Sequence, residues 1–223
     1  HTASYFNSPS VTLPAAARTG RFTLVSDAVV SHVRIDSRGR ADGVHYIDRL
    51  SHRPREASAR VVVLAAGALE STRILLNSRS PLFSEGVGNE EGVLGHYLMD
   101  HFTVEGGGGF MPGLRSSSRE PVGRPCGFII PNYTNLRASR NPNFVRGYRF
   151  DGDGSQELYG HAFLLQEFGD AWRQKVRQDI PYYFALEAQG ECLPRKDNYV
   201  TLDAAKKDKW GIPALHIVAS YGE

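Results

Sequence analysis

One short turn in the sequence combines small residues with a position suited to ligand binding. Ala65-Ala66-Gly67 follows the apolar run Val61–Leu64 and precedes Ala68–Asn77, a stretch of good helix formers. Ligands of open α/β sheets bind beyond the carboxyl ends of the strands, where the chain turns into a helix. Small residues there let the backbone approach a planar or phosphorylated ligand closely. The same residues also fit an ordinary tight turn between a strand and a helix, so both interpretations stay open at this point.

Two other patterns begin like binding motifs but fail on spacing. Gly86–Gly92 resembles a dinucleotide fingerprint, yet it is one residue too long and follows no apolar strand. Asp151–Ser155 begins like a calcium loop, but Gln156 and Ala162 occupy the positions that need a glycine and a bidentate glutamate. We therefore predict a loop at the first place and a glycine-rich turn at the second.

The elements that must hold the Ala65–Gly67 turn are indicated by the pattern of apolar residues. Val61–Leu64 is apolar at successive positions, which is typical of a strand buried on both faces in a parallel sheet. Val29–Ile35 and Asp42–Ile47 are rich in β-formers and are separated by a turn. We expect a β-meander there, followed by a loop that contains Pro54.

After residue 80 the sequence changes character, because glycines cluster and strand-like runs alternate with long loops. This pattern predicts a largely antiparallel sheet with one helix over Asp170–Arg177. The candidate strands are Phe102–Glu105, Cys126–Ile130, Tyr159–Gln166, Tyr182–Ala188, Tyr199–Leu202 and Ala214–Val218.

The composition is that of an ordinary globular protein, with 22% charged and 41% hydrophobic residues. A net charge of +2 is too small to indicate nucleic acid or an anionic membrane as a partner. No apolar run reaches the roughly 18 residues of a membrane span. Cys126 and Cys192 lack C-x-x-C spacing, so neither a zinc site nor a redox dithiol is expected, and a disulfide is neither inferred nor excluded.

Several segments of the chain resemble, in the same order, segments of one enzyme family. Val61–Ser78 has an apolar strand-like run, an Ala-Ala-Gly turn and a helix-like run with Ser, Thr and Leu-Leu. The other matching segments are Phe6–Pro14, Thr19–Leu24, Gly88–His101, Asp197–Asp203 and Lys209–Pro213. These segments resemble the glucose–methanol–choline (GMC) oxidoreductase family, in which the first is the second flavin-contacting segment. The resemblance covers most of the chain and is weak over 102–180.

The resemblance implies an FAD-dependent enzyme that oxidises an alcohol group, most similar to bacterial members acting on sugars, glucosides or sugar acids. The fold class it implies is α+β or α/β: a partial Rossmann-like FAD-binding domain over 1–100 joined to a mainly antiparallel substrate domain over 101–223. The cofactor contacts it implies are the backbone of Val30, close approach at Ala65, Ala66 and Gly67, and, as weaker candidates, Glu70 and Ser71. Substrate identity, electron acceptor and compartment are not determined by the sequence.

Two parts of that family are expected outside the chain. Both ends of the sequence look like cuts, so we expect the dinucleotide fingerprint before His1 and the catalytic histidine, with its His or Asn partner, after Glu223. No catalytic residue is therefore assigned, and we predict that the isolated chain neither retains FAD tightly nor turns over substrate. A non-catalytic binding or assembly module derived from the substrate domain remains the alternative. Loss of cover over Val61–Leu64 predicts self-association.

Isolated polar side chains give weaker indications. His96 and His101 flank a segment expected to cross between domains and could approach a flavin, but a lone histidine is more often a hydrogen-bonded structural group. His216 on the last predicted strand is expected to be structural as well. Three residues on late predicted strands could line a sugar pocket or equally a solvent-exposed sheet face: Gln166, Glu187 and Gln189.

Overall fold

The computed structural model describes residues 6–110, 127–137, 140–153, 162–163, 165–179 and 183–222. The chain forms two compact units. Thr19–Met99 with Leu193–Glu223 is called the meander unit, and His1–Arg18 with Asp100–Cys192 is called the sheet unit. The last segment, Leu193–Glu223, groups with Thr19–Met99, and the functional domain boundary expected near residue 100 stays a prediction.

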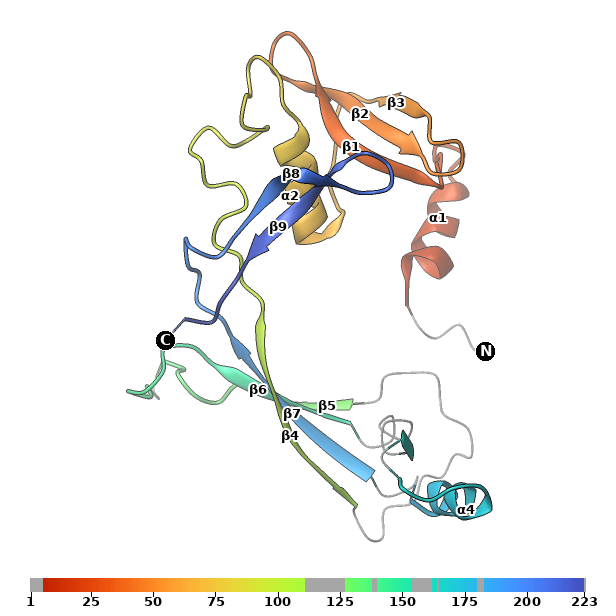
Figure 1. The fold of residues 1–223 in the computed structure, drawn as a ribbon, viewed down its shortest axis with the longest axis vertical. Helices are drawn as coiled ribbons and strands as arrows, with labels where there is room; N and C mark the ends of the chain where they lie inside the picture. The colour runs from red at the N-terminus through yellow and green to blue at the C-terminus, as the bar shows by residue number, and fades with distance from the viewer. Residues whose placement is uncertain are drawn as a thin grey trace. The chain divides into compact units, whose positions relative to one another are not determined.

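The meander unit begins with a three-stranded antiparallel sheet in the order β1-β2-β3 (Figure 1). β1 (Ala28–Ile35) and β2 (Ala41–Asp48) confirm the predicted meander. The loop predicted around Pro54 is wrong, because β3 spans Pro54–Ser58 and pairs with β2. Proline is tolerated there since it is the first residue of an edge strand, where a missing N–H breaks no ladder.

Helix α2 (Gly67–Asn77) confirms the predicted helix and packs against β1. Ser78, directly after the helix, is only 1% exposed. Its hydroxyl donates to the Ile74 carbonyl at 2.6 Å and accepts from the Val33 N–H at 2.8 Å. The Asn77 amide adds a hydrogen bond to the Ser31 carbonyl at 2.9 Å. The C-terminal end of α2 is thereby fixed to the middle of β1.

A second hairpin, β8 (Tyr199–Lys207) and β9 (Pro213–Val218), packs on α2 from the far end of the sequence (Figure 1). Arg73 of α2 joins the two: its guanidinium donates to the Pro213 and Ile212 carbonyls at 2.7 and 3.1 Å and to Asp208 at 2.8 Å. Burial opposes ionisation of Asp208, but Arg73 and nearby backbone N–H groups outweigh it and lower the pKa of Asp208. This ion pair ties together segments far apart in sequence.

The prediction of a buried strand at Val61–Leu64 is wrong. These residues join none of the three sheets formed by the described residues. Val61 and Val63 are 74% and 80% exposed instead of buried. A parallel strand needs hydrogen-bonded neighbours and covered faces, and the described residues supply neither to this run. All strand pairs in the described residues are antiparallel, so the expected parallel Rossmann-like sheet is not among them.

The sheet unit contains an antiparallel sheet in the order β4-β7-β6-β5, as the second half of the sequence predicted. Its strands are β4 (His101–Phe110), β5 (Gly127–Ile130), β6 (Tyr148–Asp153) and β7 (Tyr183–Glu191). The unit also has the short helices η1 (Ser8–Thr12) and α1 (Leu13–Ala17), and α4 (Asp170–Asp179), which confirms the predicted helix.

Two predictions in this unit are wrong or untested. A glycine-rich turn is expected at Asp151–Ser155, but Asp151–Asp153 form the end of strand β6. These residues pair with β7 through Asp153. Most of the strand expected at Tyr159–Gln166 lies outside the described residues, and Gln166 itself is in no strand. Cys126 also lies outside them.

Replacing Ser78 by alanine tests the link between α2 and β1. Ser78→Ala removes the acceptor of the Val33 N–H and leaves a buried donor unpaired, so we expect the free energy of unfolding to fall by about 1–3 kcal/mol. Urea unfolding followed by circular dichroism measures this. Ser84 is exposed, so Ser84→Ala serves as the matched control and is expected to change stability by less than about 0.5 kcal/mol. Equal effects of the two changes would contradict the proposed link.

Candidate functional site

The Ala65–Gly67 turn is open and has a left-handed backbone at its glycine. Ala65 and Ala66 are exposed, and Gly67 starts α2 with a positive φ of 80°. No atom lies within 4 Å of where a Cβ on Gly67 would be. A side chain there would therefore meet no neighbour but would impose a left-handed backbone on an L-residue. The Ala66 N–H donates to the Ser71 hydroxyl at 3.2 Å, so Ser71 holds the turn in place.

The first turn of α2 leaves backbone donors available. The first four N–H groups of an α-helix have no partner within the helix, and Ala66 at the N-cap makes no side-chain capping hydrogen bond. Unpaired N–H groups and the helix dipole together favour an anion at this end. The Glu70 carboxylate, 54% exposed, lies 3.3 Å from the Arg73 guanidinium. Its charge is thus partly balanced within the helix surface.

The structure gathers five of the six predicted cofactor residues and places the sixth on another element. Ala65 and Ala66 directly precede α2, and Gly67, Glu70 and Ser71 lie at its N-terminal end. Val30 lies on β1, opposite Tyr46, and is half-buried. The hydrogen bonds from β1 to α2 are at the helix's C-terminal end, and an eleven-residue helix is about 16 Å long. The grouping of the five residues follows from the fold, whereas their contact with a cofactor stays a prediction.

A cavity of about 270 Å³ lies beside the same helix, and sequence reasoning missed it. It is lined by Ala68, Leu69 and Thr72 of α2, by residues 95–99 and by Val200 of β8. Gly95 makes it possible, because the Val200 N–H donates to its carbonyl at 2.8 Å and a Cβ on Gly95 would collide with the Val200 carbonyl. That close approach between distant segments left no pattern in the sequence.

His96 lines this cavity and is hydrogen bonded, which confirms its structural interpretation. Its Nδ1 lies 2.7 Å from the Lys196 carbonyl, which can only accept, so Nδ1 carries the proton. The ring also lies against Tyr199, with the centroids 5.5 Å apart. His101, by contrast, is exposed at the start of β4. His216 lies on β9, as expected from the sequence.

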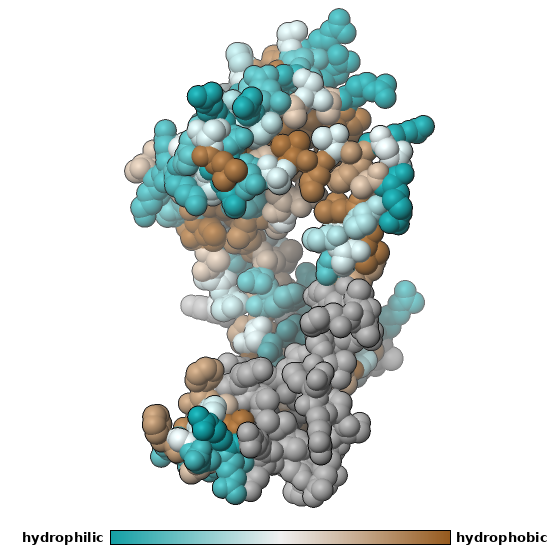
Figure 2. Space-filling view, turned by 90° about the vertical axis from the view of Figure 1, so that its right-hand side faces the viewer, coloured by the Kyte–Doolittle hydropathy of each residue, from teal (hydrophilic) through white to brown (hydrophobic). Residues whose placement is uncertain are grey.

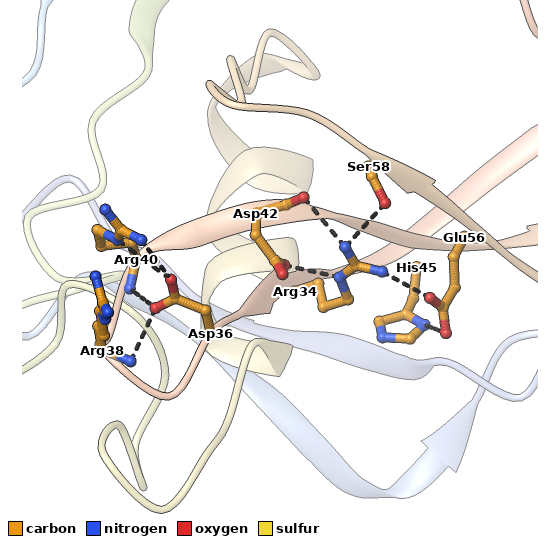
Figure 3. Close-up of polar contacts among 8 residues, drawn as sticks. All are labelled: Arg34, Asp36, Arg38, Arg40, Asp42, His45, Glu56 and Ser58. Atoms are coloured by element: carbon orange, nitrogen blue, oxygen red, sulfur yellow. Dashed lines mark hydrogen bonds and ion pairs between the residues drawn. The ribbon is translucent and has the colours of Figure 1, made fainter.

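The three strands of the meander together carry a dense polar cluster (Figure 3). The Arg34 guanidinium donates to Asp42 at 2.7 Å, to Glu56 at 2.7 Å and to the Ser58 hydroxyl at 2.9 Å. Hydrogen bonds to Asp42 and then Glu56 raise the pKa of Arg34. All three nitrogen atoms of the Arg34 guanidinium already donate hydrogen bonds within the cluster. The cluster therefore stabilises the sheet and offers little to an external anion.

Two findings bear on metals and membranes. No group of three or more His, Cys, Asp or Glu side chains in the described part of the chain is placed to hold a metal ion. No helix among the described residues is long and apolar enough to cross a membrane.

Comparison with known proteins identifies the class. Residues 6–103 match the family model described as GMC oxidoreductase, a segment that holds the meander, the Ala65–Gly67 turn and α2. Over this segment the chain is similar to this family of oxidoreductases.

Three relatives are similar over most of the chain. The 6'''-hydroxyparomomycin C oxidase of Streptomyces lividus is 32% identical over 93% of the chain. The 2-methyl-1,2-propanediol dehydrogenase of Mycolicibacterium austroafricanum is 26% identical over 84%, and the fructose dehydrogenase large subunit of Gluconobacter japonicus is 24% identical over 90%. The chain spans 35–36% of the length of these curated relatives.

The meander contains a pH-sensitive pair that provides a test of its packing. The His32 and His45 rings stack with centroids 4.4 Å apart, and His45 also lies 3.5 Å from Glu56. Partial burial, followed by the charge of His45, lowers the pKa of His32 below its ordinary value of 6.5. The unfolded chain then binds the His32 proton more readily than the folded chain, so stability is full above pH 6.5 and falls as the pH drops below it.

We expect His32→Gln to flatten this part of the stability curve. The measurement is urea unfolding at a series of pH values on either side of the ordinary histidine pKa. His216→Gln, on β9, is the control and keeps the slope of the unmodified chain. A slope unchanged by His32→Gln would show that other groups cause the pH dependence.

Proposed function

We propose that this chain is part of an FAD-dependent oxidoreductase that oxidises an alcohol group of a small polyol or sugar. The observation that carries the proposal is the family match over residues 6–103, because this segment includes the Ala65–Gly67 turn, which is exposed and has open space at the Cβ position of Gly67. In this proposal the meander and α2 belong to a Rossmann-like FAD-binding domain over residues 1–100, and residues 101–223 are mainly a substrate domain.

The residues of the turn fit the adenosine and diphosphate part of FAD. Gly67 has open space at its Cβ position, and the neighbouring alanines are exposed, so the backbone is accessible. The unpaired N–H groups at the start of α2 suit a diphosphate. In this proposal Ser71 acts by holding the turn, since its hydroxyl already accepts from Ala66. Glu70 and Val30 are the less supported contacts.

FAD, when bound, accepts the hydride that leaves the alcohol carbon. The described residues contribute binding and orientation: the turn and the helix end hold one half of the cofactor, and Arg73 fixes that helix to the β8–β9 hairpin. No described residue is assigned as the base that removes the hydroxyl proton.

The proposed substrate class is supported by the compounds for which the relatives are named. One relative is named for a diol, one for fructose and one for a hydroxylated paromomycin. All three names denote compounds with hydroxyl groups. We therefore propose a polyhydroxylated small molecule as the substrate, with the particular compound left open.

Binding of adenosine diphosphate (ADP) tests the turn without requiring turnover. We expect ADP to shift the amide NMR signals of residues 65–71, with millimolar affinity, and Gly67→Ala to abolish the shifts by moving the turn. Gly211→Ala is a matched control, because Gly67 and Gly211 have φ values of +80° and +82° and equally open Cβ positions. Both changes are expected to reduce stability by about 1–2 kcal/mol. Loss of ADP binding in both variants, or its absence from the unmodified chain, would contradict the proposed site.

Self-association is a further part of the proposal. Hydrophobic side chains lie among hydrophilic ones on the surface drawn in Figure 2. Val61 and Val63 are 74% and 80% exposed on one extended run, which makes a continuous apolar segment available to a second copy.

Sedimentation at increasing concentration tests self-association. We expect the unmodified chain to form dimers or larger species, and Val63→Asp to shift it toward the monomer. Leu50 is 77% exposed but isolated from this run in sequence, so Leu50→Asp is the control. A monomer at all concentrations would refute the prediction.

A further inference from the structure

Four polar side chains share one face of the sheet unit's central strands. Arg149 and Asp151 lie on β6, and Gln189 and Glu187 lie on β7. In the register of the two strands Arg149 is opposite Gln189 and Asp151 is opposite Glu187, with one pair of residues between them. Since residues two apart along a strand point to the same face, these four side chains form a single patch, called here the polar patch.

The opposite face of the same strands is apolar. Tyr148 and Phe150 alternate with the polar residues of β6, and their rings meet edge-on at 5.5 Å. Phe102 and Val104 of β4 pair with Gly190 and Ala188 in the same rows, which places them on this face too. The sheet is therefore two-sided, and the polar patch is concentrated on one side.

The polar patch is a chain of hydrogen bonds with a carboxylate at each end. The Arg149 guanidinium donates to Asp151 Oδ2 at 3.1 Å and to Gln189 Oε1 at 2.8 Å. The Gln189 amide donates to Glu187 Oε1 at 3.0 Å. Arg149 and Gln189 thus orient the carboxylates of Asp151 and Glu187, and each carboxylate keeps an oxygen that none of these bonds uses.

Two features of the polar patch are unfavourable for an unliganded sheet. Asp151 and Glu187 are directly opposite each other on adjacent strands, where like charges destabilise the pairing. Asp151 Oδ1 is shielded from solvent and has no hydrogen-bond partner among the described residues, although the Asp151 side chain is 28% exposed. A buried carboxylate oxygen without a donor is costly. A ligand that donates hydrogen bonds to both carboxylates would offset the repulsion between the two charges.

We propose that the polar patch binds the substrate through two neighbouring hydroxyl groups, one donating to Asp151 and the other to Glu187. This inference rests on the proposed function and names the residues that recognise its substrate. A hydroxyl group both donates and accepts, so it can also accept from the Arg149 guanidinium or the Gln189 amide beside it.

A polyol fits this patch better than a metal cation or a phosphate. The Arg149 guanidinium, 46% exposed, already occupies Asp151 and repels a cation there. The two carboxylates repel a phosphate. Ile129 of β5 pairs with Asp151 in register and is 59% exposed, so it offers apolar surface to the carbon atoms of a sugar.

Saturation-transfer NMR on the 223-residue chain tests the inference. The probes are D-fructose and ethylene glycol, a minimal pair of neighbouring hydroxyls, with ethanol as the single-hydroxyl comparison. We expect millimolar binding of both probes and none of ethanol. Glu187→Gln and Asp151→Asn are each expected to weaken fructose binding by about tenfold or more, because each removes a charged acceptor.

Glu191→Gln is the matched control. Glu191 lies on the same strand, outside the polar patch, and pairs with Arg146 at 3.1 Å, so fructose binding should not change. Thermal unfolding separates binding from folding: Glu187→Gln removes the like-charge pair while keeping the Arg149–Asp151 contact, so its Tm should be equal to or above that of the unmodified chain.

The outcomes distinguish this inference from the proposed function. Weaker fructose binding at an equal or higher Tm in Glu187→Gln supports the polar patch as a substrate-binding surface. No binding of fructose to the unmodified chain overturns it, even if ADP still binds at the Ala65–Gly67 turn. Fructose binding in Glu187→Gln and Asp151→Asn that equals binding by the unmodified chain overturns it as well. Fructose binding without ADP binding would support the polar patch and contradict the cofactor site.

Discussion

The meander unit depends on the hydroxyl group of Ser78. This one oxygen accepts a hydrogen bond from the Val33 N–H of β1, and its own proton is donated to the Ile74 carbonyl of α2. Because the hydroxyl is buried, neither bond can be replaced by water without opening the packing between helix and sheet. With its C-terminal end fixed in this way, α2 can present its N-terminal end, and the Ala65–Gly67 turn before it, in a defined direction.

Arg73 extends that arrangement to the end of the chain. Its guanidinium pairs with Asp208 and with backbone carbonyls of the β8–β9 hairpin, so α2 lies between two sheets that come from opposite ends of the sequence. The cavity next to His96 exists because this hairpin approaches the Gly95 backbone. The position of the candidate cofactor turn is therefore a property of the whole unit and not of the turn alone.

The sheet unit shows a different balance of forces. One face of its central strands is apolar, while the other aligns two carboxylates opposite each other and supports them with Arg149 and Gln189. Such an arrangement gives up stability on the sheet surface. Natural proteins accept that loss mainly where a surface binds a ligand, since binding sites need groups that the unliganded fold does not satisfy.

The sequence by itself determined the local elements: the meander, α2, α4 and the antiparallel strands of the second half follow from short-range periodicity and turn residues. It also determined the family, because the motif around Ala65–Gly67 and its neighbours is read in chain order. The tertiary structure alone decided that residues 193–223 return to α2, that Val61 and Val63 are exposed, and that Asp151 lies opposite Glu187. These facts depend on contacts between residues far apart in the chain, and neither apolar periodicity nor motif spacing records which distant segments meet.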